Sequence, residues 1–369
     1  MLLTSHGDLP AAAPLKPDAR PRRLGWALLG AAAAAQRWAP PDWVERWFVP
    51  HVYPYEVRFL SAINVRARFS LAEVLAVALL VGGVAAILRA LWRSGNRVRR
   101  LWRGLLTLLS AAGYVAFAFS LLWGLTYRRA PMARRLGMAT GGTAAELASA
   151  ARWLATEAAR LAPPGEADRP TTLPYPPEAL HARIEEAFAQ TPEMGEHVRA
   201  PLGPAKPVFL SGVLSRLGLS GIYIPFTGEP NYNRLLPDAE LVFAIAHEKA
   251  HQRGIGPENE ANFAAFLALR ASPDPYLRYC GYLSAAGYAL RALRRVDPDA
   301  HAEFRRILAG RPAADFGAFY RFWQRYRGPV QRVSNRVNDA YLRANRVPGG
   351  VQSYDAVTDL LVGYHRTRL

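Results

Sequence analysis

The sequence contains a single cysteine, Cys280, among 369 residues, and only three of its 46 basic residues are lysines. One cysteine excludes an intrachain disulfide and a cysteine-rich metal site, which leaves histidine and carboxylate side chains as the available metal ligands. The formal net charge of +17 comes almost entirely from arginine, and no helix-turn-helix, zinc-finger or RNA-binding signature accompanies it. We therefore expect no nucleic-acid partner.

Long apolar runs are concentrated in the first third of the chain. Residues 71–92 are apolar except near their ends, and residues 104–127 carry no charge. Both runs reach the roughly 20 residues that a membrane-spanning helix needs, and Trp123 and Tyr127 are typical of aromatic residues at a membrane surface. Residues 24–37 are shorter. Their basic flank also fits a signal peptide, but no small-residue cleavage site follows, so we interpret them as a marginal first span.

The arginines around these runs predict the topology. The short connection between 71–92 and 104–127 is the most arginine-rich, which favours the cytoplasmic side for it. The chain then has a disordered cytoplasmic tail (1–23), a membrane region (24–127) in contact with the lipid bilayer, and an extracytoplasmic domain (128–369). Arginines directly after the last span argue for the opposite orientation, but they are less dense.

After about residue 140 the hydrophobic spacing is mostly helical, so the fold class is predicted as mainly α with a small β element. The predicted helices cover residues 144–161, 177–190, 238–253, 257–271, 276–296, 315–346 and 353–366. Between the second and third of these, residues 221–225 predict a short strand, which Pro225 and a Gly-Glu-Pro turn stop.

Residues 241–254 contain the motif His-Glu-x-x-His. Helical spacing places His247 and His251 one turn apart on the same face, where two imidazoles can bind a tetrahedral Zn²⁺. Glu248 is offset by one position and can take a proton from a water that the zinc activates. A five-residue match also arises by chance. The apolar run 241–246 adds weight, because it predicts a buried helix that would shield the metal.

A third metal ligand is expected from the helix that follows. Gly254 favours the left-handed conformation of a sharp turn, and Pro257 suits the first turn of a new helix. A helix folded back after so short a loop brings Glu258 beside the two histidines. Asn262, one turn later, can accept a hydrogen bond from a histidine N–H. Glu260 is the alternative ligand, but it points about 160° away from Glu258 on an ideal helix.

At these residues the chain resembles gluzincin-type metallopeptidases, which follow His-Glu-x-x-His with Glu-x-x-Ser/Ala-Asp. The segment Glu-Asn-Glu-Ala-Asn matches, except that the uncharged Asn262 replaces the aspartate. Over nearly the whole chain, a wider resemblance is to the bacterial "domain of unknown function 3810" family. The segments that carry it follow the membrane spans and are GIYIPFTGE (221–229), AHEKAHQRG (246–254), ENEANF (258–263) and NDAYL (338–342). It implies a zincin-like domain behind transmembrane helices of the bacterial inner membrane, with no assigned substrate.

Residues 221–227 form the strand that we expect to pair with a substrate backbone, because zincins often use a strand near the catalytic helix in this way. A strand that only packs against the core is an equal alternative. The candidate substrate-binding residues near this strand are Tyr223, Thr227 and Glu229. A donor that stabilises the oxyanion is also needed. The tyrosines and histidine considered for it are Tyr341, Tyr354 and His365.

These observations predict a membrane-anchored zinc-dependent metallopeptidase that hydrolyses a peptide or protein substrate. One alternative is a catalytically inactive zincin-like protein that acts as a binding, sensing or scaffold module; another is a membrane scaffold or transporter component with a chance motif. Retention of Glu248 argues against the inactive form, because a structural metal site needs no base. An intramembrane protease is not expected, because His247 lies about 120 residues after the last span.

Overall fold

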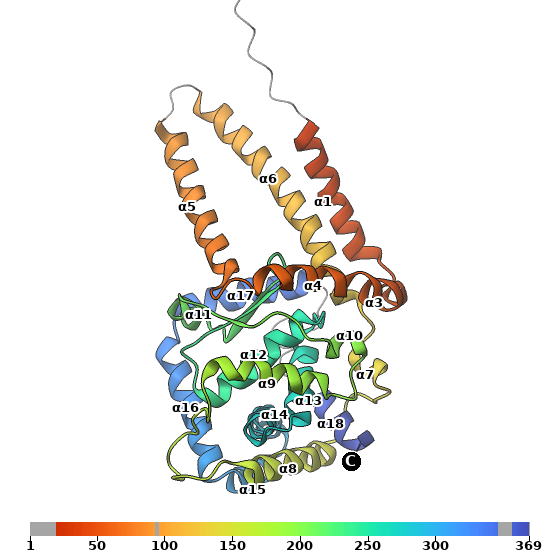
Figure 1. Cartoon of the computed structure of the whole chain (residues 1–369), viewed down its shortest axis with the longest axis vertical. Coiled ribbons are helices and arrows are strands. Elements are labelled where there is room, and N and C mark those ends of the chain that lie inside the picture. The colour runs from red at the N-terminus through yellow and green to blue at the C-terminus, as the bar shows by residue number, and fades with distance from the viewer. Residues whose placement is uncertain (1–19, 93–95, 346–355, 369) are drawn as a thin grey trace, which may run out of the picture.

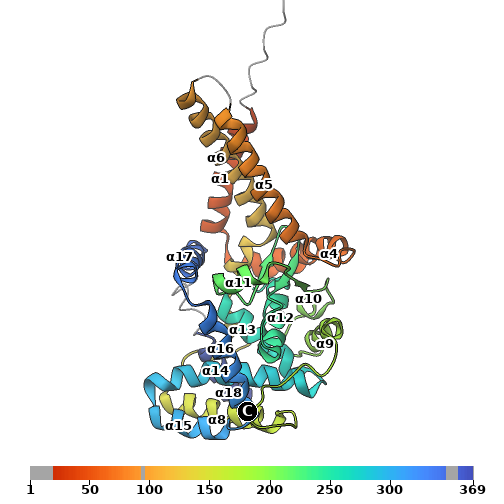
Figure 2. The same ribbon diagram turned by 90° about the vertical axis from the view of Figure 1, so that its left-hand side faces the viewer.

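The computed structural model describes residues 20–92, 96–345 and 356–368. The fold is mainly helical, with one small three-stranded sheet. Three long helices project from a helical body, namely α1 (Arg20–Trp38), α5 (Leu71–Trp92) and α6 (Arg97–Leu122). All three leave the body on the same side (Figure 1, Figure 2), and α1 packs along α6.

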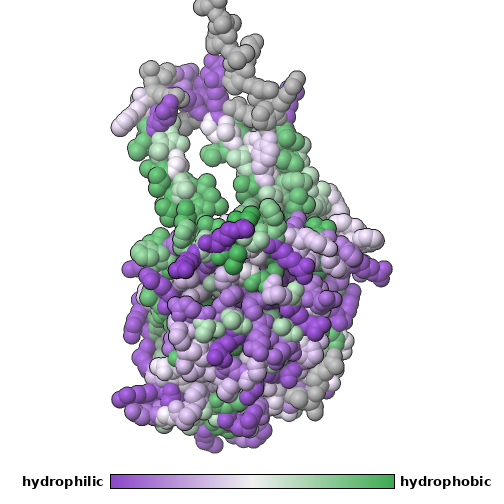
Figure 3. All heavy atoms as spheres, viewed as in Figure 1, coloured by the Kyte–Doolittle hydropathy of each residue, from purple (hydrophilic) through white to green (hydrophobic). Residues whose placement is uncertain are grey.

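Among the described residues, α5 and α6 are the two helices long and apolar enough to cross a membrane. At 1.5 Å per residue, the 22 residues of α5 extend over about 33 Å, close to the roughly 30 Å of a bilayer's hydrocarbon core. Apolar side chains such as Leu80 and Leu108 are exposed, whereas the core helix of a soluble protein would bury them. This apolar surface, visible in Figure 3, supports association with a membrane.

The projecting helices differ in their boundaries from those expected. The start of α1 lies inside the expected disordered tail (1–23), of which residues 1–19 lie outside the described part of the chain. The expected span 104–127 is divided, because α6 ends before Trp123. That residue leaves helical geometry (φ −154°) and buries its ring in the body. A 3₁₀ turn, η2 (Gly124–Arg128), follows.

Short helices connect α1 to α5 across the base of the projecting helices. They are α2 (Pro41–Trp43), the π-helical turn η1 (Val44–Phe48), α3 (Val49–His51) and α4 (Tyr53–Asn64). The longest, α4, lies across this base (Figure 1). On its inner face, Tyr53 and Val57 are buried in one apolar cluster with Trp123. This cluster joins α4 to the end of α6.

The small sheet lies next to α12 (Asp238–Gln252). Its strands are β1 (Lys206–Pro207), β2 (Gly221–Ile224) and β3 (Glu229–Tyr232). They are arranged in the order β1-β3-β2, with β3 parallel to β1 and antiparallel to β2. The strand β2 is therefore an edge strand with one side unpaired within the sheet.

Glu229 of β3 holds the first turn of α5. Its side chain is buried, and its carboxylate oxygens accept hydrogen bonds from the backbone N–H groups of Leu71 (3.1 Å) and Ala72 (2.8 Å). A carboxylate at this position satisfies N–H groups that a helix leaves unpaired and complements the helix dipole. We expected Glu229 to bind substrate. The structure instead shows that it fixes an apolar helix to the sheet.

The rest of the body is helical, with α12, α13 and α14 packed together at its centre. The remaining elements are α7 (Met132–Arg135), α8 (Ala144–Leu161), α9 (Pro177–Ala189), α10 (Glu196–Arg199), α11 (Ser211–Leu217), α13 (Glu258–Ala271), α14 (Pro275–Val296), α15 (Pro298–Ile307), α16 (Arg311–Tyr326), α17 (Pro329–Ala344) and α18 (Val357–Arg368). The expected helix 315–346 is in fact two helices, α16 and α17. They separate because Pro329 lacks the N–H that a continuous helix needs, and Gly328 before it is extended (φ 179°).

A buried group of charges attaches α12 to α9. Lys249 and Arg253, on the face of α12 opposite the motif histidines, both pair with Glu185 of α9, and Arg253 Nη2 lies 2.8 Å from its carboxylate. The Glu185→Gln variant would leave two buried cations without a counter-charge. We expect its free energy of unfolding, measured by chemical denaturation in detergent, to fall by about 3–5 kcal/mol. The exposed pair Glu303–Arg152 provides the control, since Glu303→Gln should cost no more than about 1 kcal/mol. An equal loss in both variants would contradict this prediction.

Candidate metal centre

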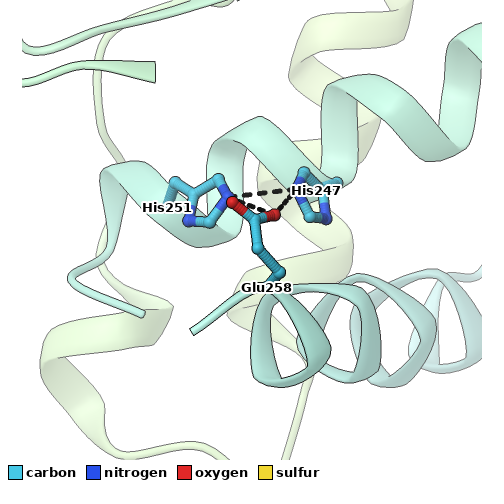
Figure 4. A group of neighbouring side chains, drawn as sticks. All are labelled: His247, His251 and Glu258. Carbon is cyan, nitrogen blue, oxygen red and sulfur yellow. Dashed lines mark hydrogen bonds and ion pairs between the residues drawn. The ribbon is translucent and has the colours of Figure 1, made fainter. Parts of the chain in front are cut away.

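Three side chains converge between α12 and α13 (Figure 4). Glu258 Oε2 lies 3.2 Å from His247 Nε2 and 3.4 Å from His251 Nε2, and the two Nε2 atoms are 3.0 Å apart. All three residues are buried. Ligand atoms at roughly 2.0–2.1 Å from a tetrahedral zinc would lie about 3.3 Å from one another. The group therefore has the spacing of a metal site.

A sharp turn between α12 and α13 brings Glu258 to the histidines. Gly254 adopts the left-handed conformation (φ 78°), and its N–H donates to the carbonyl oxygen of His251 at 2.9 Å. Pro257 then precedes Glu258, the first residue of α13. The structure thus contains the reversal that Gly254 and Pro257 predict, and it places Glu258 rather than a later residue at the histidines.

Hydrogen bonding orients His251 within the group. Its Nδ1–H donates to the carbonyl oxygen of Ile255 at 2.8 Å, which directs the Nε2 lone pair toward His247 and Glu258. Metal-binding imidazoles are commonly oriented in this way, by donating the other ring N–H to a carbonyl or carboxylate. The Nδ1 atom of His247 is buried and has no hydrogen-bond partner within the described part of the chain.

The charges in this group favour a bound cation. Burial alone would raise the pKa of the Glu258 carboxyl, but the imidazoles of His251 and His247 outweigh burial and hold that pKa well below its usual range. Burial likewise opposes protonation of His251, yet the Glu258 carboxylate raises the pKa of His251 to about 9. The buried carboxylate thus favours positive charge between the two imidazoles, and a divalent cation that displaces the His251 proton would supply it.

Glu248 lies beside the group with little access to solvent. Burial raises the pKa of its carboxyl to about 7, a value suited to a general base at neutral pH. The backbone N–H of Tyr223 on β2 donates a hydrogen bond to this carboxylate, while Oε2 has no partner among the residues that the structure describes. The carboxylate is held from one side and can accept a proton on the other.

The unpaired edge of β2 faces Glu248. The carbonyl oxygen of Ser220 accepts the N–H of Asn233 at 2.9 Å. Because backbone groups alternate along an antiparallel pair, those of Gly221 and Tyr223 therefore point away from β3. A Cβ atom at Gly221 would lie 2.6 Å from Glu248 Cγ, so glycine allows this close approach. The edge of β2 thus lies against Glu248.

A model of the family described as "Protein of unknown function (DUF3810)" matches residues 48–362. The chain belongs to this family. The matched region contains α5, α6 and the three converging side chains, and it leaves out α1. No protein with a curated description and no solved structure matches the chain. The family predicted from the sequence is confirmed, and its description assigns no function.

In this DUF3810 protein the end of α6 reaches the candidate metal centre. The ring of Trp123 lies 5.6 Å from that of His251 in an edge-to-face arrangement and 4.9 Å from the ring of Tyr223. Tyr127 of η2 packs on Trp123, and its hydroxyl is 3.2 Å from that of Tyr341. The sequence indicated Trp123 and Tyr127 only as aromatic residues at a membrane surface. No pattern in the neighbouring sequence indicated that these two residues contact the site.

Glu260, the alternative metal ligand, does not belong to the centre. Its Oε1 accepts the backbone N–H of Met132 at 2.7 Å, and its Oε2 pairs with Arg135 at 3.0 Å. It therefore points away from the histidines, as helical spacing predicts. Asn262 lines the same cleft as His247, and its Nδ2 has no hydrogen-bond partner in the described residues. The predicted hydrogen bond from a histidine N–H to Asn262 is therefore not formed: His251 Nδ1 donates to Ile255, and His247 Nδ1 has no partner among the described residues.

Tyr223 and Tyr341 both lie near the centre but differ in exposure. Tyr223 is buried, its ring packs on Trp123 and its hydroxyl is hydrogen-bonded to Tyr53, so its side chain supports β2 from behind. Tyr341 of α17 is partly exposed. Burial raises the pKa of its phenol, and the nearby Glu258 carboxylate adds to this effect. Of the two, Tyr341 therefore has the more exposed phenol and the one whose pKa the Glu258 carboxylate affects.

Of the other candidates for substrate or oxyanion binding, those that the structure describes lie elsewhere. Thr227 lies in the turn after β2, where its hydroxyl donates to the carbonyl oxygen of Ile224 at 3.4 Å. His365 of α18 stacks on Trp153 of α8 and is therefore remote from the centre. Tyr354 lies outside the described residues. These residues were candidates because their side chains are polar, and polarity alone does not indicate where a residue lies in the fold.

A cleft of about 620 Å³ opens beside the centre, with His247 in its lining. Its walls come from α12, α14 and α16, and they include aromatic side chains such as Phe243 and Trp323. Arg291 and Arg294 of α14 add positive charge to the lining. A concave, largely apolar cleft with a few polar groups is typical of a ligand site. It provides space for a ligand next to His247.

Glu240 lies on the wall of this cleft, and we expect its contribution to the stability of the fold to depend on pH. Burial raises the pKa of its carboxyl to about 7, although Trp323 donates a hydrogen bond to it at 2.6 Å. Because the folded chain holds the Glu240 proton more tightly than the unfolded chain, this group contributes its full stability below its ordinary pKa of 4.5. The contribution is lost as the pH rises through 7. Between pH 4.5 and 8, we expect Glu240→Gln to gain up to about 3 kcal/mol in free energy of unfolding relative to the native chain. A difference that stays constant in denaturation curves across this range would contradict the prediction.

Proposed function

We propose that this protein is a membrane-anchored, zinc-dependent metallopeptidase with a zincin-like catalytic domain. The observation that carries the proposal is the convergence of His247, His251 and Glu258, with the buried Glu248 beside them. Two imidazoles and one carboxylate form a donor set typical of catalytic zinc, which keeps a fourth position open. The ligand-atom distances of 3.0–3.4 Å also fit one ion.

Glu248 acts as the general base and then as the general acid. It accepts a proton from the attacking water as the water oxygen bonds to the peptide carbonyl carbon. It then gives this proton to the amine nitrogen as the C–N bond breaks. The two histidines and Glu258 would hold a zinc ion, and the bound ion would supply Lewis-acid chemistry that makes the water acidic and polarises the carbonyl. Tyr341 is the candidate donor to the developing oxyanion.

The free edge of β2 binds the substrate backbone in this proposal. Gly221 and Tyr223 direct backbone groups away from β3. Apart from the Tyr223 N–H, which donates to Glu248, these groups can pair with an extended peptide that adds to the sheet as a further strand. The cleft between α12, α14 and α16 receives side chains of the substrate, with His247 at the scissile bond. The peptide or protein substrate is therefore recognised mainly through its extended backbone.

Gly221 tests the role of this edge. In Gly221→Ala the new Cβ would meet Glu248 and the carbonyl oxygen of Asn231 at 2.6–2.7 Å, so the base must shift. Because a misplacement of about 1 Å can cost roughly 10²-fold, we expect kcat to fall about 10–100-fold with zinc content unchanged. Gly212→Ala on α11 meets only ordinary contacts and is the control. An unchanged kcat in the Gly221 variant would remove β2 from the proposed mechanism.

The protein is placed, in this proposal, as a multi-pass protein of the bacterial inner membrane with its body on the extracytoplasmic side. The far end of α6 carries Arg99 and Arg103, which favours the cytoplasmic side for that end. The arginines after α6 weigh less, because they bind the body: Arg128, Arg129 and Arg135 all donate to acceptors within it. With α1 as a third span, the N-terminus is cytoplasmic.

Metal analysis of the purified full chain tests the proposal. We expect near-stoichiometric zinc, cleavage of members of a peptide library, loss of cleavage with a chelator and its recovery when zinc is restored. Absence of bound zinc after purification without chelators would reject the metal site. Zinc without cleavage of any peptide would favour the catalytically inactive zincin-like alternative.

A further inference from the structure

Helix α4 exposes an apolar face at the base of the projecting helices. Tyr55, Phe59 and Ile63 recur every four residues and are exposed, with Phe59 at 67%. On the opposite face, Tyr53 and Val57 are buried in the cluster beneath α6. An exposed stripe of this kind on a surface helix has no partner within the described chain, so something outside the body must cover it.

Helix α17 has the same character on the other side of the base. Val330, Val333 and Val337 lie on one face, and Val337 is 65% exposed. Arg332 and Arg336 lie away from this stripe. Helices with an apolar stripe, a basic polar face and low overall hydrophobicity are typical of segments that lie in the plane of a membrane surface.

A third apolar group lies at α11, next to the start of α5. Phe209, which is 74% exposed, together with Leu210 and Val213 forms this group. The carboxylate of Glu73 in the first turn of α5 accepts the backbone N–H groups of Phe209 (2.9 Å) and Leu210 (2.7 Å). These exposed side chains are thus fixed at the level where α5 begins.

The helices α4, α11 and α17, at which the three apolar groups lie, are at one level, where α5 and α6 meet the body (Figure 1). At this level Glu229 binds the start of α5, and Tyr341 of α17 packs on Phe119 of α6 with ring centroids 6.1 Å apart. Figure 3 shows the apolar surface of the projecting helices reaching down to the body. Any bilayer that α5 and α6 cross must therefore begin at these groups.

We propose that α4, α11 and α17 form a collar whose exposed apolar side chains insert into the surface of the bilayer that α5 and α6 cross. The occupant is lipid because the body holds both spans at this level, which fixes the bilayer surface there. Exposed arginines beside the stripes, such as Arg58 on α4 and Arg332 on α17, meet anionic headgroups. The collar holds the body against the membrane and prevents free rotation about the spans.

The collar has a consequence for the substrate, which rests on the proposed function. Trp123 directly follows α6 and packs on His251, so the metal centre lies within one aromatic ring of the membrane level. A bond that enters this site must then lie close to the bilayer. The substrate class is therefore a lipid-anchored peptide or the segment of a membrane protein that directly adjoins its span.

Depth-dependent fluorescence quenching tests the collar without relying on activity. Cys280 is buried, so a cysteine introduced at Val333 can be labelled selectively with NBD in the full chain. The chain is reconstituted into vesicles of phosphatidylcholine and phosphatidylglycerol, with or without doxyl-labelled lipid. We expect Val333→Cys and Phe59→Cys to be quenched at least about twofold more than their neighbours Arg332→Cys and Arg58→Cys. Val296→Cys, an exposed valine at the end of α14 beside α15, is the control.

The outcomes separate the collar from the proposed enzyme. Equal quenching at all five positions would overturn the collar, and so would a blue-shifted label at position 333 that doxyl lipids do not quench, because a protein would then cover the stripe. With the collar confirmed, the same peptide is offered free and lipid-anchored in these vesicles, and we expect the anchored form to have a kcat/KM about tenfold higher or more. No cleavage of either form would reject the enzyme and leave the collar standing. Equal cleavage of both would overturn the substrate class.

Discussion

Replacing Glu248 with glutamine is expected to lower peptide hydrolysis by about 10²–10⁴-fold while zinc remains bound at one ion per chain. Glutamine keeps the size of the side chain, and its amide oxygen can still accept the N–H of Tyr223. It cannot take a proton from the attacking water. Because the three ligand atoms belong to other residues, the metal should be unaffected. Kinetics and metal content measured on one preparation test both halves.

The matched control for this variant is Glu157→Gln on α8, which removes a carboxylate from a surface pair with Arg160. It should leave zinc content and hydrolysis unchanged. Full activity in Glu248→Gln would show that another group moves the proton. Loss of zinc together with activity would instead show that Glu248 holds the metal, and it would contradict its role as a base that does not bind zinc.

Replacing Glu258 with glutamine should weaken zinc binding by more than about 100-fold, beyond the 10–100-fold typical of residues that only orient a ligand. The carboxylate of Glu258 supplies the third ligand atom and the only negative charge among the three ligands. An amide oxygen would ligate poorly and would leave the charge of the cation uncompensated. Competition with a chromophoric chelator measures the change in affinity.

Glu260→Gln is the discriminating control, because Glu260 is on the same helix two residues later. Its carboxylate binds Arg135 and the backbone of Met132. This variant should therefore lower the melting temperature and keep the zinc affinity of the native chain. If the two variants exchanged these phenotypes, Glu260 would be the ligand and the turn at Gly254 would place α13 differently from the structure described here.

The sequence predicts those features that are determined by residues close together in the chain. The apolar lengths of α5 and α6, the motif on α12 and the reversal at Gly254 each follow from residues close together in the chain. Helical spacing alone distinguishes Glu258 from Glu260, because side chains two positions apart on a helix point to nearly opposite sides.

The ends of the helices were harder to predict from the sequence, because they depend on what the terminal residues contact in the fold. A charge-free run reaches Tyr127, but α6 ends before Trp123, whose ring is buried in the body. At the break between α16 and α17, the helical spacing of apolar residues continues and predicts one helix, but Pro329 ends it because a proline has no N–H to donate.

The amino-acid sequence by itself determined the pair of histidines with their glutamate, the turn that returns Glu258 to them and the two apolar helices, since each rests on local spacing. Only the tertiary structure decided that Glu229 holds α5, that Trp123 packs on His251, and that the candidate metal centre lies at the base of the projecting helices. Those contacts join residues more than 100 positions apart, and no periodicity along the chain records which distant side chains will meet when the core packs.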